Sequence, residues 1–436
     1  MDINPSRPGN TDPSPAALTD DHIDAPQLRI FVMALFFIFG GITSLNDVII
    51  PKLKELFTLD YMQAMLVQSA FFGAYFVISI PGAALVRKLG YMRGATVGLL
   101  LMMTGCLLFI PASASATFGV FLTALFVLAS GITVVQVVSN PLISLLGPAT
   151  TSHSRLTFAQ GFNSLGTTIF PYVGSILILG GLARKNTAQL TGAALDAYRM
   201  AETQVVAHAY IGLAIALALV AGAVWLNRDR LKGEHHEQGS VFSGFGLLRR
   251  PRFAFGAACI FLYVGAEVSI GSMIVNYLKQ ASVLGLAAQS AGKLIPLYWG
   301  GALVGRFIGS AVLRLVSPGR VLAFNAAGAI ALILISANTV GAMAGYSLLA
   351  IGLMNSIMFP TIFSLACEGL GPRSAEGSGV ICVAIVGGAV IPPLTGHLAD
   401  LSSSLALALA LPALCYGVIT AFGLYCGKST AARADE

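Results

Sequence analysis

The chain has 436 residues, of which 56% are hydrophobic and only 10% are charged, and its formal net charge is +6. Soluble domains carry about 25% charged residues, so this composition excludes an ordinary soluble protein. A bilayer core of roughly 30 Å requires about 20 apolar residues per helix, and twelve runs of the chain approach or exceed that length.

The expected elements are therefore twelve membrane-spanning helices. In chain order they lie at about residues 29–50, 62–86, 94–111, 117–140, 157–181, 206–226, 252–278, 292–314, 320–338, 341–365, 376–398 and 403–426. The polar residues 1–27 have no basic region followed by an apolar core, so we expect a disordered cytoplasmic tail and not a cleaved signal peptide. The predicted fold class is an all-α membrane protein.

Lysine and arginine indicate the orientation of these helices. The loops after even-numbered helices, with their boundary residues, hold thirteen of them, and the loops after odd-numbered helices hold seven. Because cytoplasmic loops are enriched in these residues, we expect both termini in the cytoplasm and the chain in the inner membrane. The positive net charge is then a topology signal and gives no support for nucleic-acid binding.

The two halves of the chain share sequence features. The segment from Gly82 through Arg87 to Arg93 returns as Gly309, Arg314 and Arg320, and the pair Gly166 and Pro171 returns as Gly387 and Pro392. These repeats favour a duplication, with six-helix bundles at 28–226 and 252–427, a linker at 227–251 and a cytoplasmic tail at 428–436. Two such bundles enclose a shared cavity in secondary transporters. We expect the arginines of the repeated loops to have structural or gating roles.

Twelve helices, a six-plus-six duplication and the two Gly-x4-Arg-x5-Arg loops resemble the major facilitator superfamily. The resemblance implies two pseudo-symmetric bundles that transport by alternating access. Val86 or Arg87 stands where that superfamily commonly has an aspartate, so its usual cytoplasmic charge relay is not carried over.

Longer motifs resemble one family within it. Asn46-Asp47, residues 136–141 and residues 155–168 are similar to the fucose–galactose–glucose proton symporters, and residues 265–278 resemble their glucose/galactose branch. The resemblance implies proton-coupled sugar uptake. The fucose branch has a glutamate, held to take part in proton coupling, where this chain has Gln136, so a relay of two carboxylates is not implied.

Asp47 is a carboxylate near the end of the first apolar run. A charge inside a membrane segment costs several kcal/mol and usually marks a function, so we predict that Asp47 carries the coupling proton. Sodium in place of the proton, no coupling, or a merely hydrated acid at the helix end remain open. Asn46 beside it is a predicted sugar ligand.

Amides in the fourth and fifth helices form a second group of candidates. Gln136 and Asn140 are four residues apart, and Gln160 and Asn163 are three apart, so each pair shares a helix face. Amides donate and accept hydrogen bonds as sugar hydroxyls do. We predict Gln136, Gln160 and Asn163 to bind the sugar, with interhelical bonding as the alternative. Asn140, before Pro141 at an expected helix break, is predicted to be structural.

The second half adds its own candidates. Glu267 is a second deep acid, which could bind the sugar, bind the coupling ion or pair with Arg306, a residue otherwise expected to be structural. Asn276 and Asn355 are predicted sugar ligands. Trp299 either stacks on a sugar ring or packs against its neighbours.

The sequence has no nucleotide-binding loop, nucleophile elbow or metal-ligand cluster, so we expect neither an enzyme nor a cofactor beyond the coupling ion. The predicted function is secondary active uptake of a glucose- or galactose-type hexose with a proton, by a chain working as a monomer in the bilayer. The alternatives are a sodium-coupled or uncoupled carrier, uptake of fucose or N-acetylglucosamine, and a sugar receptor that transports nothing.

Overall fold

The computed structural model describes residues 26–45, 61–115, 117–174, 176, 192–231 and 240–434. Every part of it that is regular is helical. In the first half the helices are α1 (Pro26–Ser44), α3 (Tyr61–Leu89), α4 (Tyr91–Ser115), α5 (Phe118–Leu145), α6 (Ser152–Gly174) and α7 (Ala193–Leu226).

The second half contains more and shorter helices. They are α8 (Pro251–Leu278), α9 (Ala288–Gly292), α10 (Ile295–Val312), α11 (Pro318–Asn338), α12 (Gly341–Asn355), α13 (Met358–Cys367), α14 (Ser374–Ala384), α15 (Gly387–Ser402), α16 (Leu405–Ala408) and α17 (Ala410–Ala434). Short 3-10 helices η1 (Ala149–Thr151), η5 (Arg228–Arg230), η6 (Ser243–Arg249) and η7 (Gly371–Arg373) lie between them. Each predicted run coincides with at least one helix, and the all-α membrane fold is confirmed.

Ten described helical stretches are long and apolar enough to cross a membrane. α6, which is described only to Gly174 and carries Gln160 and Asn163, and α10, which carries Arg306, are not among them. These two helices pack against each other. Polar groups of α6 and α10 therefore lie at the contact between the halves, where they meet protein instead of lipid.

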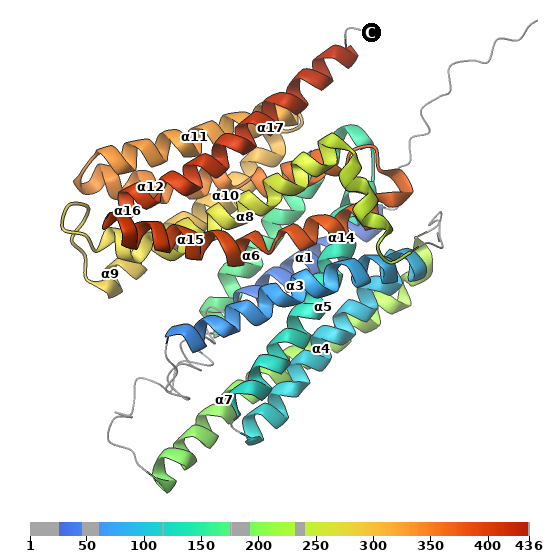
Figure 1. Ribbon diagram of the computed structural model, residues 1–436. Coiled ribbons are helices and arrows are strands. Elements are labelled where there is room, and N and C mark those ends of the chain that lie inside the picture. Colours follow the sequence, from blue (N-terminus) through green and yellow to red (C-terminus); the bar gives the residue numbers. More distant parts are fainter. Residues whose placement is uncertain are drawn as a thin grey trace, which may run out of the picture.

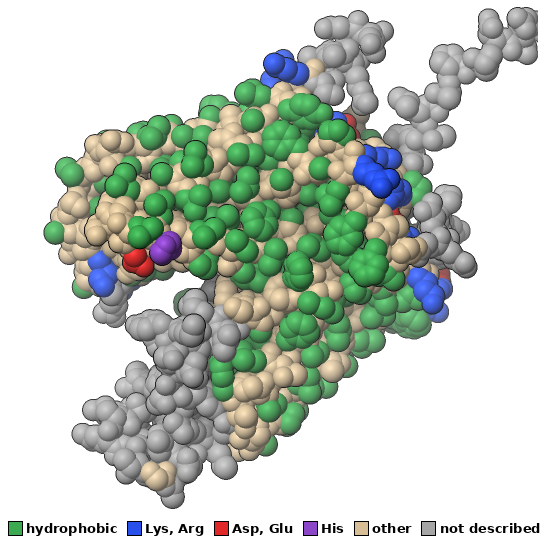
Figure 2. All heavy atoms as spheres, in the orientation of Figure 1, with side chains coloured by type: hydrophobic (Ala, Val, Ile, Leu, Met, Phe, Trp, Pro, Cys, Tyr) green, Lys and Arg blue, Asp and Glu red, His purple; other side chains and the backbone are tan. Residues whose placement is uncertain are grey.

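The helices form two groups, α1 with α3–α7 and α8 with the helices up to α17. In Figure 1 α1, α3, α4, α5 and α7 lie mostly below the second group, and α6 runs behind it. The groups meet where α3 packs on α14 and where α6 packs on α10 and α13. The end that carries η1, η6, η7 and the arginine-rich loops is called here the basic end. In Figure 2 the Lys and Arg side chains in view lie mostly toward this end.

The repeated glycines occupy equivalent places in the two bundles. A Cβ added at Gly166 of α6 would lie 2.1 Å from the carbonyl oxygen of Phe37 in α1. A Cβ added at Gly387 of α15 would lie 1.9 Å from the carbonyl oxygen of Phe261 in α8. In each half the first helix thus touches the fifth through a glycine, as close helix packing in membranes requires. This contact supports the predicted duplication.

Three helices predicted to be continuous are broken. The expected helix at 341–365 is divided between Asn355 and Met358, that at 376–398 between Ala384 and Gly387, and that at 403–426 between Ala408 and Ala410. In the first case Pro360 has no N–H to donate to the carbonyl of Ser356, four residues before it. The Nε of Arg306 donates to that carbonyl instead, at 3.2 Å. The break therefore supplies an acceptor that α10 uses.

A predicted break is absent in α5. The sequence suggested that the helix is interrupted at Asn140-Pro141, but α5 is continuous from Phe118 to Leu145 with Pro141 inside it. Nearly every residue from 128 to 143 is buried against α3, α4 and neighbouring helices. Membrane helices tolerate proline where the surrounding protein supports the freed backbone groups, so burial keeps this helix intact.

We predict that Gly166→Ala lowers the stability of the protein, because the added methyl group would overlap the Phe37 carbonyl. Overpacking of this kind costs about 1–3 kcal/mol, and the melting temperature in detergent should fall. Gly212→Ala is the matched control, since a Cβ there meets nothing within 4 Å. Equal melting temperatures for the two variants would contradict the contact between α1 and α6.

Candidate functional site

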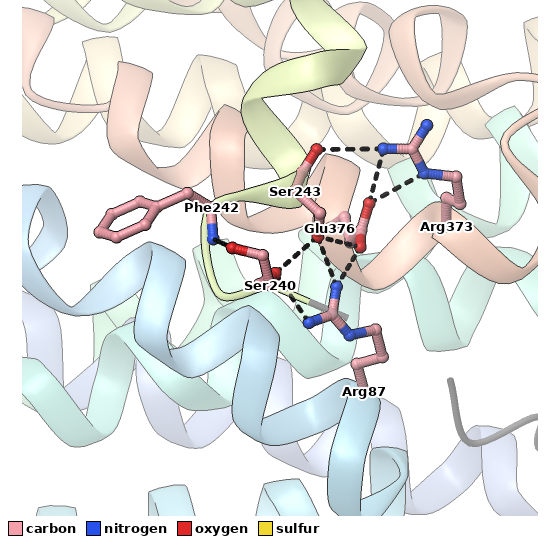
Figure 3. Close-up of polar contacts among 6 residues, drawn as sticks. All are labelled: Arg87, Ser240, Phe242, Ser243, Arg373 and Glu376. Atoms are coloured by element: carbon pink, nitrogen blue, oxygen red, sulfur yellow. Dashed lines mark hydrogen bonds and ion pairs between the residues drawn. The ribbon is translucent and has the colours of Figure 1, made fainter. Parts of the chain in front are cut away.

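The basic end is closed by one buried carboxylate. Glu376, at the start of α14, accepts hydrogen bonds from Arg87 of α3, from Arg373 (Nε to Oε2, 2.9 Å) and from the hydroxyl of Ser243 (2.6 Å). Figure 3 shows the carboxylate between the two guanidinium groups, with the Ser240–Ser243 segment beside them. Arg87 also donates to the carbonyl of Ser240 at 3.0 Å. The Ser240–Ser243 part of the segment between the halves is therefore bonded both to α3 of the first half and to α14 of the second.

Burial makes this cluster costly to disturb. The side chains of Arg87 and Glu376 are only 8% and 7% exposed. Two buried ions are stable only when further hydrogen bonds complete their partners, and removing one partner leaves the other charge uncompensated. Since Arg87 and Glu376 belong to different bundles, the cluster stabilises the arrangement in which the bundles touch at the basic end.

Further contacts between the bundles lie at the same end. The hydroxyl of Ser154 donates to the carbonyl of Ser310 at 2.6 Å and accepts from the Nε of Arg314 at 3.1 Å. The Nδ1 of His153 lies 2.6 Å from the Ser364 hydroxyl oxygen. Both contacts join the start of α6 to the end of a helix of the second half. The bundles are therefore held together on both sides of the basic end.

Arg306 of α10 links the bundles deeper in the membrane. Its Nη1 donates to the carbonyl of Gln160 at 3.0 Å and to the Ser164 hydroxyl, both on α6. Its Nε holds the Ser356 carbonyl already described. The predicted structural role agrees with this geometry. Among the described side chains no ion pair joins Arg306 to Glu267, so the pairing suggested as one alternative from the sequence is not formed.

Glu267 lies near the middle of α8 in a group of hydroxyl and amide side chains. The hydroxyl of Tyr263 is 2.8 Å from its Oε1 and 3.0 Å from the carbonyl oxygen of Asn355. Asn355, fully buried, donates from Nδ2 to the hydroxyl of Tyr298 at 2.8 Å. Trp299 is 42% exposed and meets Tyr298 edge to face. Three predicted site residues of the second half thus lie close together.

The amides of the first half form a smaller group. Gln160 donates to Asn140 at 3.4 Å, and Gln136 accepts from the hydroxyl of Tyr75 at 2.7 Å. Asn163 donates to the carbonyl of Phe36 at 3.4 Å. These bonds join helices of one bundle, which agrees with the interhelical alternative. Each side-chain amide keeps unused bonding capacity, and the Nδ2 of Asn140 has no partner within the described structure.

The remaining candidates are not brought into these groups. Asn46 and Asp47 lie outside the described residues. Asn276 is exposed and lies nine residues beyond Glu267, about 14 Å further along the helix axis. Arg93 makes only an exposed 3.7 Å contact with Asp229. Arg320 is exposed, and no ion pair of the described residues includes it.

Sequence reasoning missed three side chains of these groups. Glu376 follows Arg373 by three residues at a helix start, a spacing that could have indicated the pair. Tyr263 precedes Glu267 by four residues and shares its helix face. Tyr75 gave no signal, because its link to Gln136 depends on how α3 packs against α5.

Two bundles that meet at one end and enclose polar groups from both halves define a major facilitator fold. The chain belongs to the Major Facilitator Superfamily, whose family model matches residues 32–393. It is a multi-pass membrane protein of a class whose members are transporters.

Individual relatives cover almost the whole chain. It is 47% identical over 401 residues to a glucose/galactose transporter of Brucella abortus, a match that covers 91% of this chain and 93% of the relative. It is 33% identical over 416 residues to the L-fucose-proton symporter of Escherichia coli, covering 92% and 95%. Two crystal structures of a fucose:proton symporter superpose with TM-scores of 0.84 and 0.83, at 30% and 31% identity, each covering 91% of this chain and 98% of the other.

We predict that Glu376→Gln opens the basic end. Neutralising the buried carboxylate removes the partner of two arginines, so the closed arrangement should lose stability. Labelling of the buried Cys382 of α14 by a maleimide, followed by mass spectrometry, should accelerate at least about tenfold.

Glu368→Gln is the matched control for this experiment. Glu368 pairs with Arg252 at the same end, but both residues belong to the second half, so labelling of Cys382 should stay at the wild-type rate. Equal acceleration in the two variants would contradict a gating role for Glu376.

Proposed function

We propose that this chain imports a hexose of the glucose/galactose type together with a proton, by alternating access across the inner membrane. The observation that carries the proposal is its 47% identity, over 91% of its length, to a protein named a glucose/galactose transporter. The symporters of fucose and protons among its relatives support coupling to the proton. A transporter of this kind needs no catalytic step and no cofactor besides the coupling ion.

The orientation follows from the charge of the loops. Cytoplasmic loops are enriched in Lys and Arg, so the basic end is assigned to the cytoplasm, together with both termini. The contacts of Glu376, Ser154 and Arg306 hold the two bundles together at that end. Contacts at this end favour an outward-facing arrangement, and one of the two fucose symporter structures is in the outward conformation.

The sugar site is proposed between the two polar groups. The Asn140–Gln160 pair offers amides from the first bundle, and Asn355 and Trp299 offer an amide and an aromatic face from the second. A sugar that bonds to both bundles stabilises each arrangement in which they approach it. Differential binding of this kind is what couples a ligand to a change of state.

Asp47 remains the proposed coupling residue on the grounds of its position in the first apolar run. A proton bound to Asp47 would neutralise its carboxylate before the conformational change closes the site off from water. Sodium remains the alternative ion, since carboxylate and carbonyl oxygens bind it as well.

We predict that proteoliposomes accumulate radiolabelled galactose when the lumen is alkaline relative to the medium, and that an inward sodium gradient has no such effect. Asp47→Asn should abolish accumulation, because an amide cannot carry the proton. Arg249→Gln, a change at an exposed residue of the basic end, is the control and should accumulate the sugar normally. Accumulation that follows sodium, or that persists in Asp47→Asn, would contradict the assignment.

A further inference from the structure

If Glu267 is ionised, the group around it has more hydrogen-bond acceptors than donor protons. The Tyr263 hydroxyl has one proton and faces two acceptors, Glu267 Oε1 at 2.8 Å and the Asn355 carbonyl at 3.0 Å. Asn355 is the last residue of α12, so its carbonyl has no intrahelical partner. A proton on Glu267 resolves the conflict, because Glu267 then donates to the Tyr263 oxygen while Tyr263 donates to the carbonyl.

The charges around Glu267 lead to the same conclusion. Within the described ranges, no Lys, Arg or His lies within ion-pair distance of its carboxylate. The titratable groups that face it are Tyr263 on its own helix, Tyr298 and Arg306 of α10, and Tyr416 of α17. Three of these are neutral phenols and the fourth, Arg306, is bonded elsewhere. An unpaired carboxylate at this depth costs several kcal/mol, which protonation avoids.

We propose that Glu267 carries a transported proton in the outward-facing state. In the fucose branch, a glutamate that is held to take part in proton coupling stands where this chain has Gln136, and Glu267 takes over that role here. This assignment rests on the proposed proton symport. It places the second proton-carrying group in the second bundle, whereas the glutamate of the fucose branch corresponds to a position in the first. Glu267 is half-buried. Because the bundles are joined at the basic end, the proposal places proton entry at the opposite end.

Arg306 explains how Glu267 releases its proton when the basic end opens. In the described state its guanidinium donates to Gln160 and Ser164 across the interface between bundles. Opening the basic end must separate α6 from α10 and break both bonds. Arg306 then loses its α6 acceptors. Its remaining partner, the Ser356 carbonyl, is next to Asn355, whose own carbonyl accepts from Tyr263 beside Glu267. The positive charge of Arg306 favours the carboxylate, so the O–H bond of Glu267 breaks and the proton passes to water at the basic end.

Infrared spectroscopy of the full-length protein in liposomes at neutral pH tests the first step directly. The carbonyl stretch of a protonated carboxyl group should be present in the wild type and lost in Glu267→Gln. Glu368→Gln is the matched control: Glu368 pairs with Arg252 within the second half, so the basic end stays closed and this band should persist. A band unchanged by Glu267→Gln would overturn the proposal. Tyr263→Phe covers the case in which Glu267→Gln does not fold, and should shift the band by removing its hydrogen-bond acceptor; an unshifted band would overturn the proposal.

Transport separates a proton role from a structural one. In Glu267→Gln and in Arg306→Gln, uptake driven by a pH gradient should fall at least tenfold more than exchange of internal for external galactose, because exchange requires no release of the proton. Equal losses of the two activities would overturn the proposal. If wild-type protein transports no hexose, the proposed function fails, and the infrared result still decides whether Glu267 is protonated.

Discussion

A charged or polar group inside a membrane must find its partner within the protein, and this chain meets that demand mainly at the contact between its two bundles. Arg306 is the central case. Its guanidinium takes acceptors from α6 and from the broken α12–α13 helix, so it is satisfied only while the bundles touch. The same bonds that make the arginine tolerable in the membrane therefore depend on the conformation.

This dependence links the gate to the site. The break between α12 and α13 presents the Ser356 carbonyl to Arg306 on one side and the Asn355 carbonyl to Tyr263 on the other. A movement of α10 relative to α6 breaks the bonds of Arg306 to Gln160 and Ser164, while its bond to the Ser356 carbonyl joins it to the broken helix. The broken helix is thus a short mechanical connection between the interface and the polar group around Glu267. Helices that are interrupted near a binding site recur in secondary transporters for the same physical reason.

Composition and repeated motifs were sufficient to predict the helical spans, the duplication and the family, because the length of an apolar run and the spacing of a motif are local properties of the sequence. Asn355 and Glu267 were found for the same reason, as polar residues in apolar runs. The helix breaks were misplaced. The helix that contains Pro360 is broken, and the carbonyl left without a partner accepts from Arg306 of another helix. The helix that contains Pro141 stays continuous, because it is buried among its neighbours. Glu376 and Tyr263 were missed because their importance comes from partners in other helices. Contacts between residues that are far apart in the sequence cannot be predicted from local sequence patterns.

The central claim is that proton movement and hexose movement are one process in this chain. The most direct measurement is the galactose gradient at which net flux vanishes in proteoliposomes, determined over a series of imposed pH gradients without sodium. The account predicts that this gradient shifts about tenfold per pH unit for each coupled proton, since a tenfold concentration ratio and a tenfold proton ratio are equal free energies. A null point that stays at equal galactose concentrations for every pH gradient would contradict it.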